Sequence, residues 1–224
     1  MLKQNGFMPS VMCSNMRSLE RDMVFYQEQF SYLHIDVCDG HFCPNIAAGP
    51  DIANTLREIA PMQMDYHFMT TDPERIIPLF DIRRGDQVSI QIESLSAPSV
   101  LIRKLHDKGA DVLLALKPAT PLSGLEYLWQ HIDGINVMMI EPGYGKQNAQ
   151  EEMFRKIADV RDEAVRRGFG GMKIQVDGNV SMQHVRKMKK NGANQFVLGT
   201  SALFTDGYID VKKYSEFTEV FAEK

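Results

Sequence analysis

Short apolar runs recur along the chain roughly every 25–30 residues, and each is followed by a segment whose apolar residues have helical spacing. Such repeated pairs of a strand and a helix are typical of a parallel sheet with crossover helices. The apolar runs predict eight strands, at Phe7–Met12, Tyr32–Val37, Gln63–Phe68, Gln87–Ile92, Val112–Leu116, Gly134–Met139, Lys173–Val176 and Gln195–Leu198.

The segments between these runs predict the helices, and proline and glycine mark several of their ends. Pro73, Pro98 and Pro121 fall where the first turn of a helix tolerates proline. Gly109 and Gly192 fall where a helix would end. We expect helices to begin near Leu19, Asp51, Asp72, Pro98, Pro121, Gln150 and Ser181, with a last helix from about Val211 to Ala222.

Eight parallel strands with no linker between them favour one domain over residues 1–224, folded as an α/β TIM barrel, the closed (β/α)₈ fold. An open, Rossmann-like sheet is the alternative. It is disfavoured because the segment after the first strand, Pro9–Ser14, lacks the glycine-rich loop that binds dinucleotides. In a barrel, the chemistry is expected at the C-terminal ends of the strands.

The composition narrows the class of partner. The 224 residues carry a formal net charge of −4 and contain no basic run, which argues against nucleic acid. No apolar stretch approaches the ~20 residues that span a bilayer, and the N-terminus has no signal pattern, so we expect no membrane partner and a cytoplasmic location. Three cysteines are too few for a disulfide framework.

Four side chains at or just after predicted strand ends are the strongest candidates for chemistry: His34, Asp36, His67 and Asp177. The alternation of a strand sends His34 and Asp36 to the same face, so one strand offers two ligands to a single ion. Two imidazoles and two carboxylates suit a divalent cation such as zinc, manganese, iron(II), cobalt or magnesium, and availability decides among them. Asp39, just before Gly40, is expected to form a turn instead of adding a fifth ligand.

Glycine-containing loops after the last three strands form a second group. Glycine lets backbone N–H groups approach a ligand closely, and a following helix start favours an anion. Together these loops predict the phosphate site that barrels place beside their last strands. The loops are Gly143-Tyr144-Gly145-Lys146, Gly178-Asn179 and Gly199-Thr200-Ser201.

Three stretches resemble the ribulose-phosphate 3-epimerase family: HIDVCDGHFCPN at His34–Asn45, EPGYG at Glu141–Gly145, and VDGN at Val176–Asn179. The resemblance runs from about Met8 to Phe204. It implies a TIM barrel, inversion of C3 in a ketose phosphate, and a divalent metal cofactor. It also implies a small-molecule sugar phosphate as partner and a homo-oligomer, either a dimer or a hexamer.

The resemblance also implies roles for individual residues. Metal ligands fall on His34, Asp36, His67 and Asp177, with Asp36 as proton acceptor and Asp177 as proton donor. Substrate contacts fall on Ser10, His67, Met69 and Met138, and phosphate contacts on Gly143, Tyr144, Gly145, Lys146, Gly178, Asn179, Gly199, Thr200 and Ser201.

The chain departs from the family pattern at several positions. Gln91 stands where relatives often have histidine, Cys38 where methionine is common, and Lys146 where the phosphate loop usually has a second glycine. These departures leave the ligands and carboxylates intact and leave more than one substrate open.

Several readings of the function therefore stay open. Ribulose 5-phosphate and xylulose 5-phosphate are the default pair, although Pro9–Cys13 and Gly199–Phe204 look more like the allulose 6-phosphate 3-epimerase branch. A phosphosugar-binding barrel without catalysis is a lesser alternative. A lyase or decarboxylase without a metal is disfavoured because it leaves His34 and His67 without a role.

Overall fold

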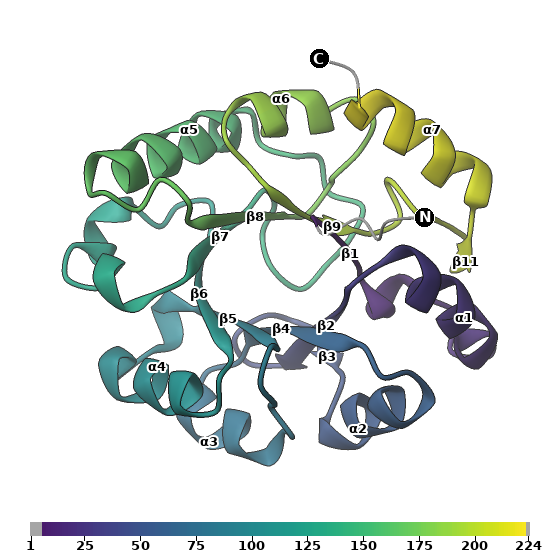
Figure 1. Ribbon diagram of the computed structural model, residues 1–224, viewed down its shortest axis with the longest axis horizontal. Coiled ribbons are helices and arrows are strands. Elements are labelled where there is room, and N and C mark those ends of the chain that lie inside the picture. The colour runs from purple at the N-terminus through teal and green to yellow at the C-terminus, as the bar shows by residue number, and fades with distance from the viewer. Residues whose placement is uncertain (1–5, 223–224) are drawn as a thin grey trace.

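The structure is a computed structural model that describes residues 6–222, so the outermost residues of the predicted 1–224 domain lie outside it. Eight parallel strands form a ring with helices around its outside (Figure 1). The ring closes because β1 pairs with β9 on one side and meets β2 through a parallel bridge between Ser10 and His34 on the other. The predicted α/β barrel is thus confirmed. Its strands are β1 (Phe7–Pro9), β2 (Tyr32–Asp39), β4 (Gln63–Met69), β5 (Gln87–Gln91), β6 (Asp111–Leu116), β7 (Gly134–Met138), β8 (Lys173–Asp177) and β9 (Gln195–Leu198).

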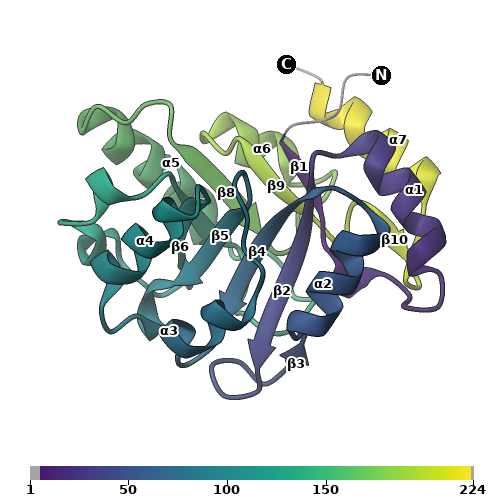
Figure 2. The same cartoon turned by 60° about the horizontal axis from the view of Figure 1, so that its bottom comes forward.

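All eight predicted strands form, and two differ clearly in length. The first ends at Pro9, and Val11–Cys13 turn into a short 3-10 helix instead. The second continues to Asp39 because its end pairs with the antiparallel strand β3 (Ile46–Ala47). Figure 2 shows β2 running along the barrel to β3 at its C-terminal end. A two-residue hairpin, β10 (Phe204–Thr205) with β11 (Tyr208–Ile209), follows the last barrel strand.

The helices cover the outside of the ring, and one prediction is wrong. No α-helix begins near Pro121 within the described chain; two 3-10 turns, Leu122–Leu125 and Trp129–His131, take its place. Ser123 and Gly124 are poor helix formers, which explains the difference. The helix expected near Ser181 begins at Val185. The helices are α1 (Leu19–Gln29), α2 (Pro50–Ile59), α3 (Pro73–Ile76), α4 (Pro98–Asp107), α5 (Glu151–Arg166), α6 (Val185–Lys190) and α7 (Val211–Ala222).

The two faces of the ring differ in chemistry. Outward-facing residues pack under the helices, and on β2 these are Leu33, Ile35 and Val37 of the main apolar core. The inward face carries polar side chains that are fully buried: His34, Asp65, His67, Gln87, Ser89, Gln91, Asn136 and Gln175. Buried polar groups need hydrogen-bond partners, so this interior is a network that fixes side-chain positions. No helix within residues 6–222 is long and apolar enough to cross a membrane.

Gly134 begins β7 at a point where the two neighbouring strands leave no room for a side chain. A Cβ there would lie 2.6 Å from the carbonyl oxygen of Lys173 and 2.9 Å from Cγ of Leu113. We expect Gly134→Ala to lower the free energy of unfolding by ~1–3 kcal/mol, measured by urea denaturation, because both neighbours belong to the closed ring.

Gly171→Ala is the matched control. A Cβ at Gly171 would meet no heavy atom of the described residues within 4 Å. Its effect should therefore stay within ~0.5 kcal/mol. Equal losses in the two variants would contradict the packing explanation.

Candidate metal and active site

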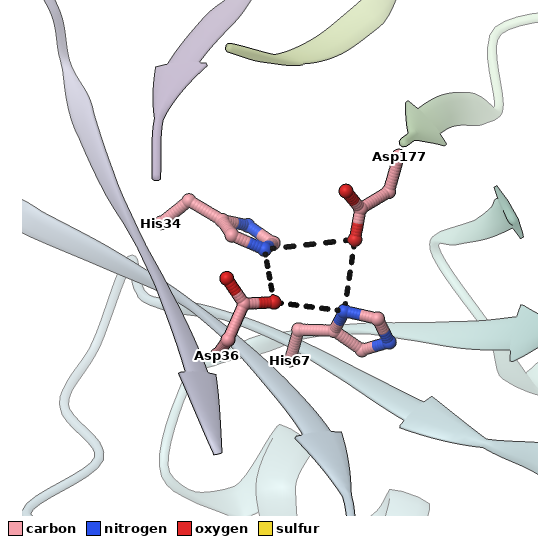
Figure 3. Close-up of side chains that lie close together, drawn as sticks. All are labelled: His34, Asp36, His67 and Asp177. Atoms are coloured by element: carbon pink, nitrogen blue, oxygen red, sulfur yellow. Dashed lines mark hydrogen bonds and ion pairs between the residues drawn. The ribbon is translucent and has the colours of Figure 1, made fainter. Parts of the chain in front are cut away.

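The structure brings His34, Asp36, His67 and Asp177 together at the C-terminal mouth of the barrel (Figure 3). His34 and Asp36 come from β2, His67 from β4 and Asp177 from the end of β8. One ligand atom from each of the four lies within 4.8 Å of the other three. The period-two argument that placed His34 and Asp36 on one face is thus confirmed.

The four ligand atoms form a closed ring of short contacts. Asp36 Oδ1 lies 3.2 Å from His34 Nε2 and 3.5 Å from His67 Nδ1. Asp177 Oδ2 lies 3.0 Å from His67 Nδ1 and 3.8 Å from His34 Nε2. Bonds of about 2.0–2.2 Å to a central cation separate tetrahedral ligands by roughly 3.3–3.6 Å. The four atoms therefore fit a divalent cation with only small adjustments.

A buried carboxylate below the cluster orients the first imidazole. Asp65 Oδ2 lies 2.7 Å from His34 Nδ1, and both side chains are fully buried. An Nδ1–H that donates to Asp65 leaves the Nε2 lone pair of His34 for a metal. Asp65 also accepts hydrogen bonds from Nε2 of Gln87 at 2.8 Å and from Nε2 of Gln175 at 2.7 Å. Asp65 is thereby fixed from three sides.

The charges in the cluster shift one another's protonation. Burial alone would lower the pKa of both imidazoles, but the carboxylates outweigh it: Asp36 and Asp65 raise the pKa of His34 well above its usual value. The nearby carboxylates of Asp177 and Asp36 likewise raise the pKa of His67 to about 9. Burial acts to raise the pKa of Asp36, yet the two histidines hold it far below its usual range. Without a metal, the cluster is therefore a set of ion pairs at neutral pH.

A cavity of about 420 Å³ opens above the cluster. The carboxylates of Asp36 and Asp177 line it, whereas the imidazoles of His34 and His67 lie beneath its floor and are fully buried. The other predicted substrate contacts all line it: Ser10, Met69, Met138, Gly143, Tyr144, Gly145, Lys146, Gly178, Asn179, Gly199, Thr200 and Ser201. The structure thus gathers these residues around one space.

The glycine loops at one end of the cavity have shapes that depend on glycine. Gly143 and Gly178 have φ angles of 104° and 97°. A Cβ on Gly178 would lie 2.3 Å from a side-chain carbon of Ile140. The backbone N–H groups of Asn179 and Ser201 donate to no acceptor among residues 6–222. Free backbone donors beside a cavity suit an anion such as a phosphate.

Other contacts around the mouth were not predicted. Asn45 Nδ2 donates to the carbonyl oxygen of Gly143 at 2.9 Å, which ties the loop after β2 to the phosphate-side loop. Met12 and Cys13 line the cavity because the first strand ends early. Asn45 could have been found from the sequence, because it is a polar residue inside the family motif. Nothing in the sequence showed that the first strand would end early and leave Met12 at the cavity.

Asp39 forms a turn, as expected. Its carboxylate accepts the backbone N–H groups of His41 and Phe42 at 2.9 Å each and of Thr71 at 2.7 Å. Burial acts to raise the pKa of Asp39. The hydrogen bonds from the backbone N–H groups of Thr71, Phe42 and His41 outweigh it and lower the pKa to about 2. Asp39 therefore holds the loop after β2 instead of joining the metal ligands.

Comparisons with known proteins agree with these observations. The model of the Ribulose-phosphate 3 epimerase family matches residues 7–204. The ribulose-phosphate 3-epimerase of Eremothecium gossypii is 33% identical over 218 residues, which cover 92% of this chain and 89% of that protein. The ribulose-phosphate 3-epimerase of Bacillus subtilis is 33% identical over 181 residues, 81% of this chain and 82% of that protein.

Solved structures of other proteins share the fold. A crystal structure of KGPDC from Streptococcus mutans has a TM-score of 0.63, and the match covers 98% of this chain and 100% of that chain. Its sequence identity is 10%, so this likeness concerns the barrel alone.

The raised histidine pKa values predict that metal binding depends on pH. Below pH about 9 the metal-free His67 is an imidazolium with a proton on each nitrogen, and so is His34. A cation must therefore displace one proton from each ring. We expect the affinity for Mn²⁺ to fall as pH falls from 8.5 to 6.5, by about tenfold per pH unit for each displaced proton. Competition with a chromophoric chelator measures this. His67→Asn should show a slope smaller by one proton, and an affinity that does not change with pH would contradict the protonation scheme.

Proposed function

Because this chain belongs to the ribulose-phosphate 3-epimerase family, we propose that it interconverts D-ribulose 5-phosphate and D-xylulose 5-phosphate with a divalent cation at His34, Asp36, His67 and Asp177. It is an isomerase that acts on carbohydrate phosphates. The observation that supports the mechanism is that the two carboxylates of the cluster are partly exposed and the two imidazoles are not. The side chains of Asp36 and Asp177 are 17% and 14% exposed to the cavity, whereas both imidazoles are fully buried.

Of the four ligands, only the two carboxylates can therefore touch a substrate. Asp36 stands on β2 and Asp177 on β8, on different sides of the barrel mouth. Inversion at a carbon needs a base on one face and an acid on the other. Asp36 takes the proton from C3 and Asp177 delivers one to the opposite face; the roles exchange in the reverse reaction.

The neighbouring residues prepare these two groups. Ser10 Oγ donates to Asp36 Oδ2 at 2.9 Å, which holds the second oxygen of that carboxylate at the cavity wall. A divalent cation bound by the four ligands would act as a Lewis acid on the negative charge that develops on the sugar oxygens. Met69 and Met138 line the same cavity and would keep water from the reacting carbons.

The phosphate group would bind at the glycine loops. The free N–H groups of Asn179 and Ser201 supply donors, and Lys146 lines the cavity at the same end. Binding energy from a remote phosphate fixes C3 between the two carboxylates, which lowers the entropic part of the barrier. The same end of the cavity also decides how long a sugar the site takes.

Allulose 6-phosphate remains the second candidate substrate. The segments Pro9–Cys13 and Gly199–Phe204 favour it, and both line the cavity in part. The names of the relatives favour the pentulose. A hexulose is longer by one carbon, and a pocket built for one length discriminates against the other by about 10- to 200-fold.

The substrate prediction follows from that discrimination. We expect kcat/KM for D-ribulose 5-phosphate to exceed that for D-allulose 6-phosphate by about tenfold or more, measured with coupled assays on the same metal-loaded protein. A preference for the hexulose would reassign the substrate and leave the reaction class unchanged. Activity on neither sugar, with full metal content, would contradict the proposed function.

The two-base scheme predicts opposite defects in two variants. Asp36→Asn and Asp177→Asn should each lower epimerisation by about 100- to 10,000-fold, because each removes one proton-transfer group. Each should still exchange the C3 proton of one epimer with deuterium from solvent, and the two variants should act on different epimers. NMR of the recovered sugar phosphates in D₂O measures this.

Metal content must be measured in parallel, since both residues are also ligands. Asp51→Asn, an exposed carboxylate on α2, is the matched control and should behave as the wild type. Exchange into the same epimer by both metal-loaded variants would contradict the assignment of one base to each face.

A further inference from the structure

The second imidazole of the cluster, that of His67, is backed by an amide and not by a carboxylate. Gln91 ends β5, and its Nε2 lies 2.9 Å from Nε2 of His67. Both side chains are fully buried. The ring of His67 therefore lies between the metal position at Nδ1 and the amide of Gln91 at Nε2.

In this orientation the amide NH₂ group donates to Nε2, so the proton of a neutral His67 would sit on Nδ1. That arrangement leaves two buried atoms without a hydrogen bond to any described residue, Nδ1 of His67 and Oε1 of Gln91. Nδ1 lies only 3.0 Å from Asp177 Oδ2, yet its direction does not suit a hydrogen bond to that oxygen. Such a direction suits a lone pair that points between the carboxylates.

Turning the side-chain amide of Gln91 by 180° gives a suitable role to both of these atoms, Nδ1 of His67 and Oε1 of Gln91. The amide oxygen and nitrogen exchange places with almost no change of shape. Oε1 then accepts the Nε2–H of His67, and the Nδ1 lone pair is free to bind a cation. Each imidazole ligand needs such an acceptor on its other nitrogen to fix its tautomer.

Asn136 is the candidate acceptor for the turned NH₂ group. Gln91, Ala115 and Asn136 are in register on three adjacent strands, so their side chains share the inner face. The Cα atoms of Gln91 and Asn136 are thus roughly 10 Å apart, a span that two inward amides cover directly or through one water. Both amide atoms of Asn136 are buried and have no partner among residues 6–222.

We propose that Gln91 is a positioning residue that fixes the tautomer of His67 for metal binding. Its oxygen accepts from Nε2–H, which leaves the Nδ1 lone pair for the cation. Asp65 plays this part for His34 as a carboxylate, and Gln91 plays it for His67 as an uncharged amide. This inference rests on the metal site of the proposed function and is independent of the substrate.

The test measures zinc affinity by chelator competition, a readout that does not require epimerase activity. Gln91→Met keeps the volume but removes the acceptor, and we expect it to weaken zinc binding by about 10- to 100-fold. Gln91→Glu restores an acceptor and should bind zinc at least as tightly as the wild type. Gln195→Met is the matched control, because Gln195 is a buried amide that contacts Gln87 and none of the ligands.

A second measurement reads the tautomer itself. In the zinc-loaded wild type, ¹⁵N NMR of the imidazoles should show the His67 proton on Nε2 and the His34 proton on Nδ1. At saturating zinc, Gln91→Met should keep kcat within about tenfold, since the residue acts through metal binding. Zinc affinity of Gln91→Met within threefold of the Gln195→Met control, or a zinc-loaded His67 with its proton on Nδ1, would overturn the proposal. A zinc-loaded wild type that epimerises neither sugar phosphate, together with weakened zinc binding in Gln91→Met, would count against the proposed function alone.

Discussion

The hydrogen bond between Asp65 and His34 is the contact on which the site depends. It is short, 2.7 Å, and lies in the fully buried interior of the barrel. An uncompensated carboxylate there would be costly, and Asp65 is tolerated because Gln87 and Gln175 also donate to it from β5 and β8. The same three contacts tie together strands on different sides of the ring. The interior thus gives up apolar packing for a polar network that holds the first ligand in a single orientation.

The closed ring explains why ligands distant in sequence meet. In a parallel barrel every strand ends at the same mouth, so His34, His67 and Asp177 come within a few ångströms of one another although more than 100 residues separate the first from the last. Alternation along β2 then adds Asp36 beside His34. The same alternation sends Leu33, Ile35 and Val37 outward to the helices, so one strand serves the apolar core and the metal site at once.

The pattern of the sequence predicts the strands and the four ligands because both follow from periodicity. Two kinds of feature could not be predicted from this periodicity. The helix expected at Pro121 is replaced by 3-10 turns, since local propensity at Ser123 and Gly124 outweighs the repeat. The residues that hydrogen-bond to the two histidine ligands, Asp65 and Gln91, were also not predicted as part of the site. Asp65 had a usable signal, because it stands two residues before His67 and so shares its face. Gln91 lies on another strand, and its contact with His67 depends on the register between β4 and β5.

The charges of the cluster explain how so many ionisable groups can share a buried space with and without metal. Asp36, Asp65 and Asp177 contribute three negative charges. In the metal-free protein, the raised pKa values keep both imidazoles protonated at neutral pH, which leaves a net charge of about −1. A divalent cation that displaced the two imidazole protons would bring two positive charges and remove two, so the net charge would be the same. Metal uptake would then be an exchange within a preformed site, without the cost of an unpaired buried charge in either state.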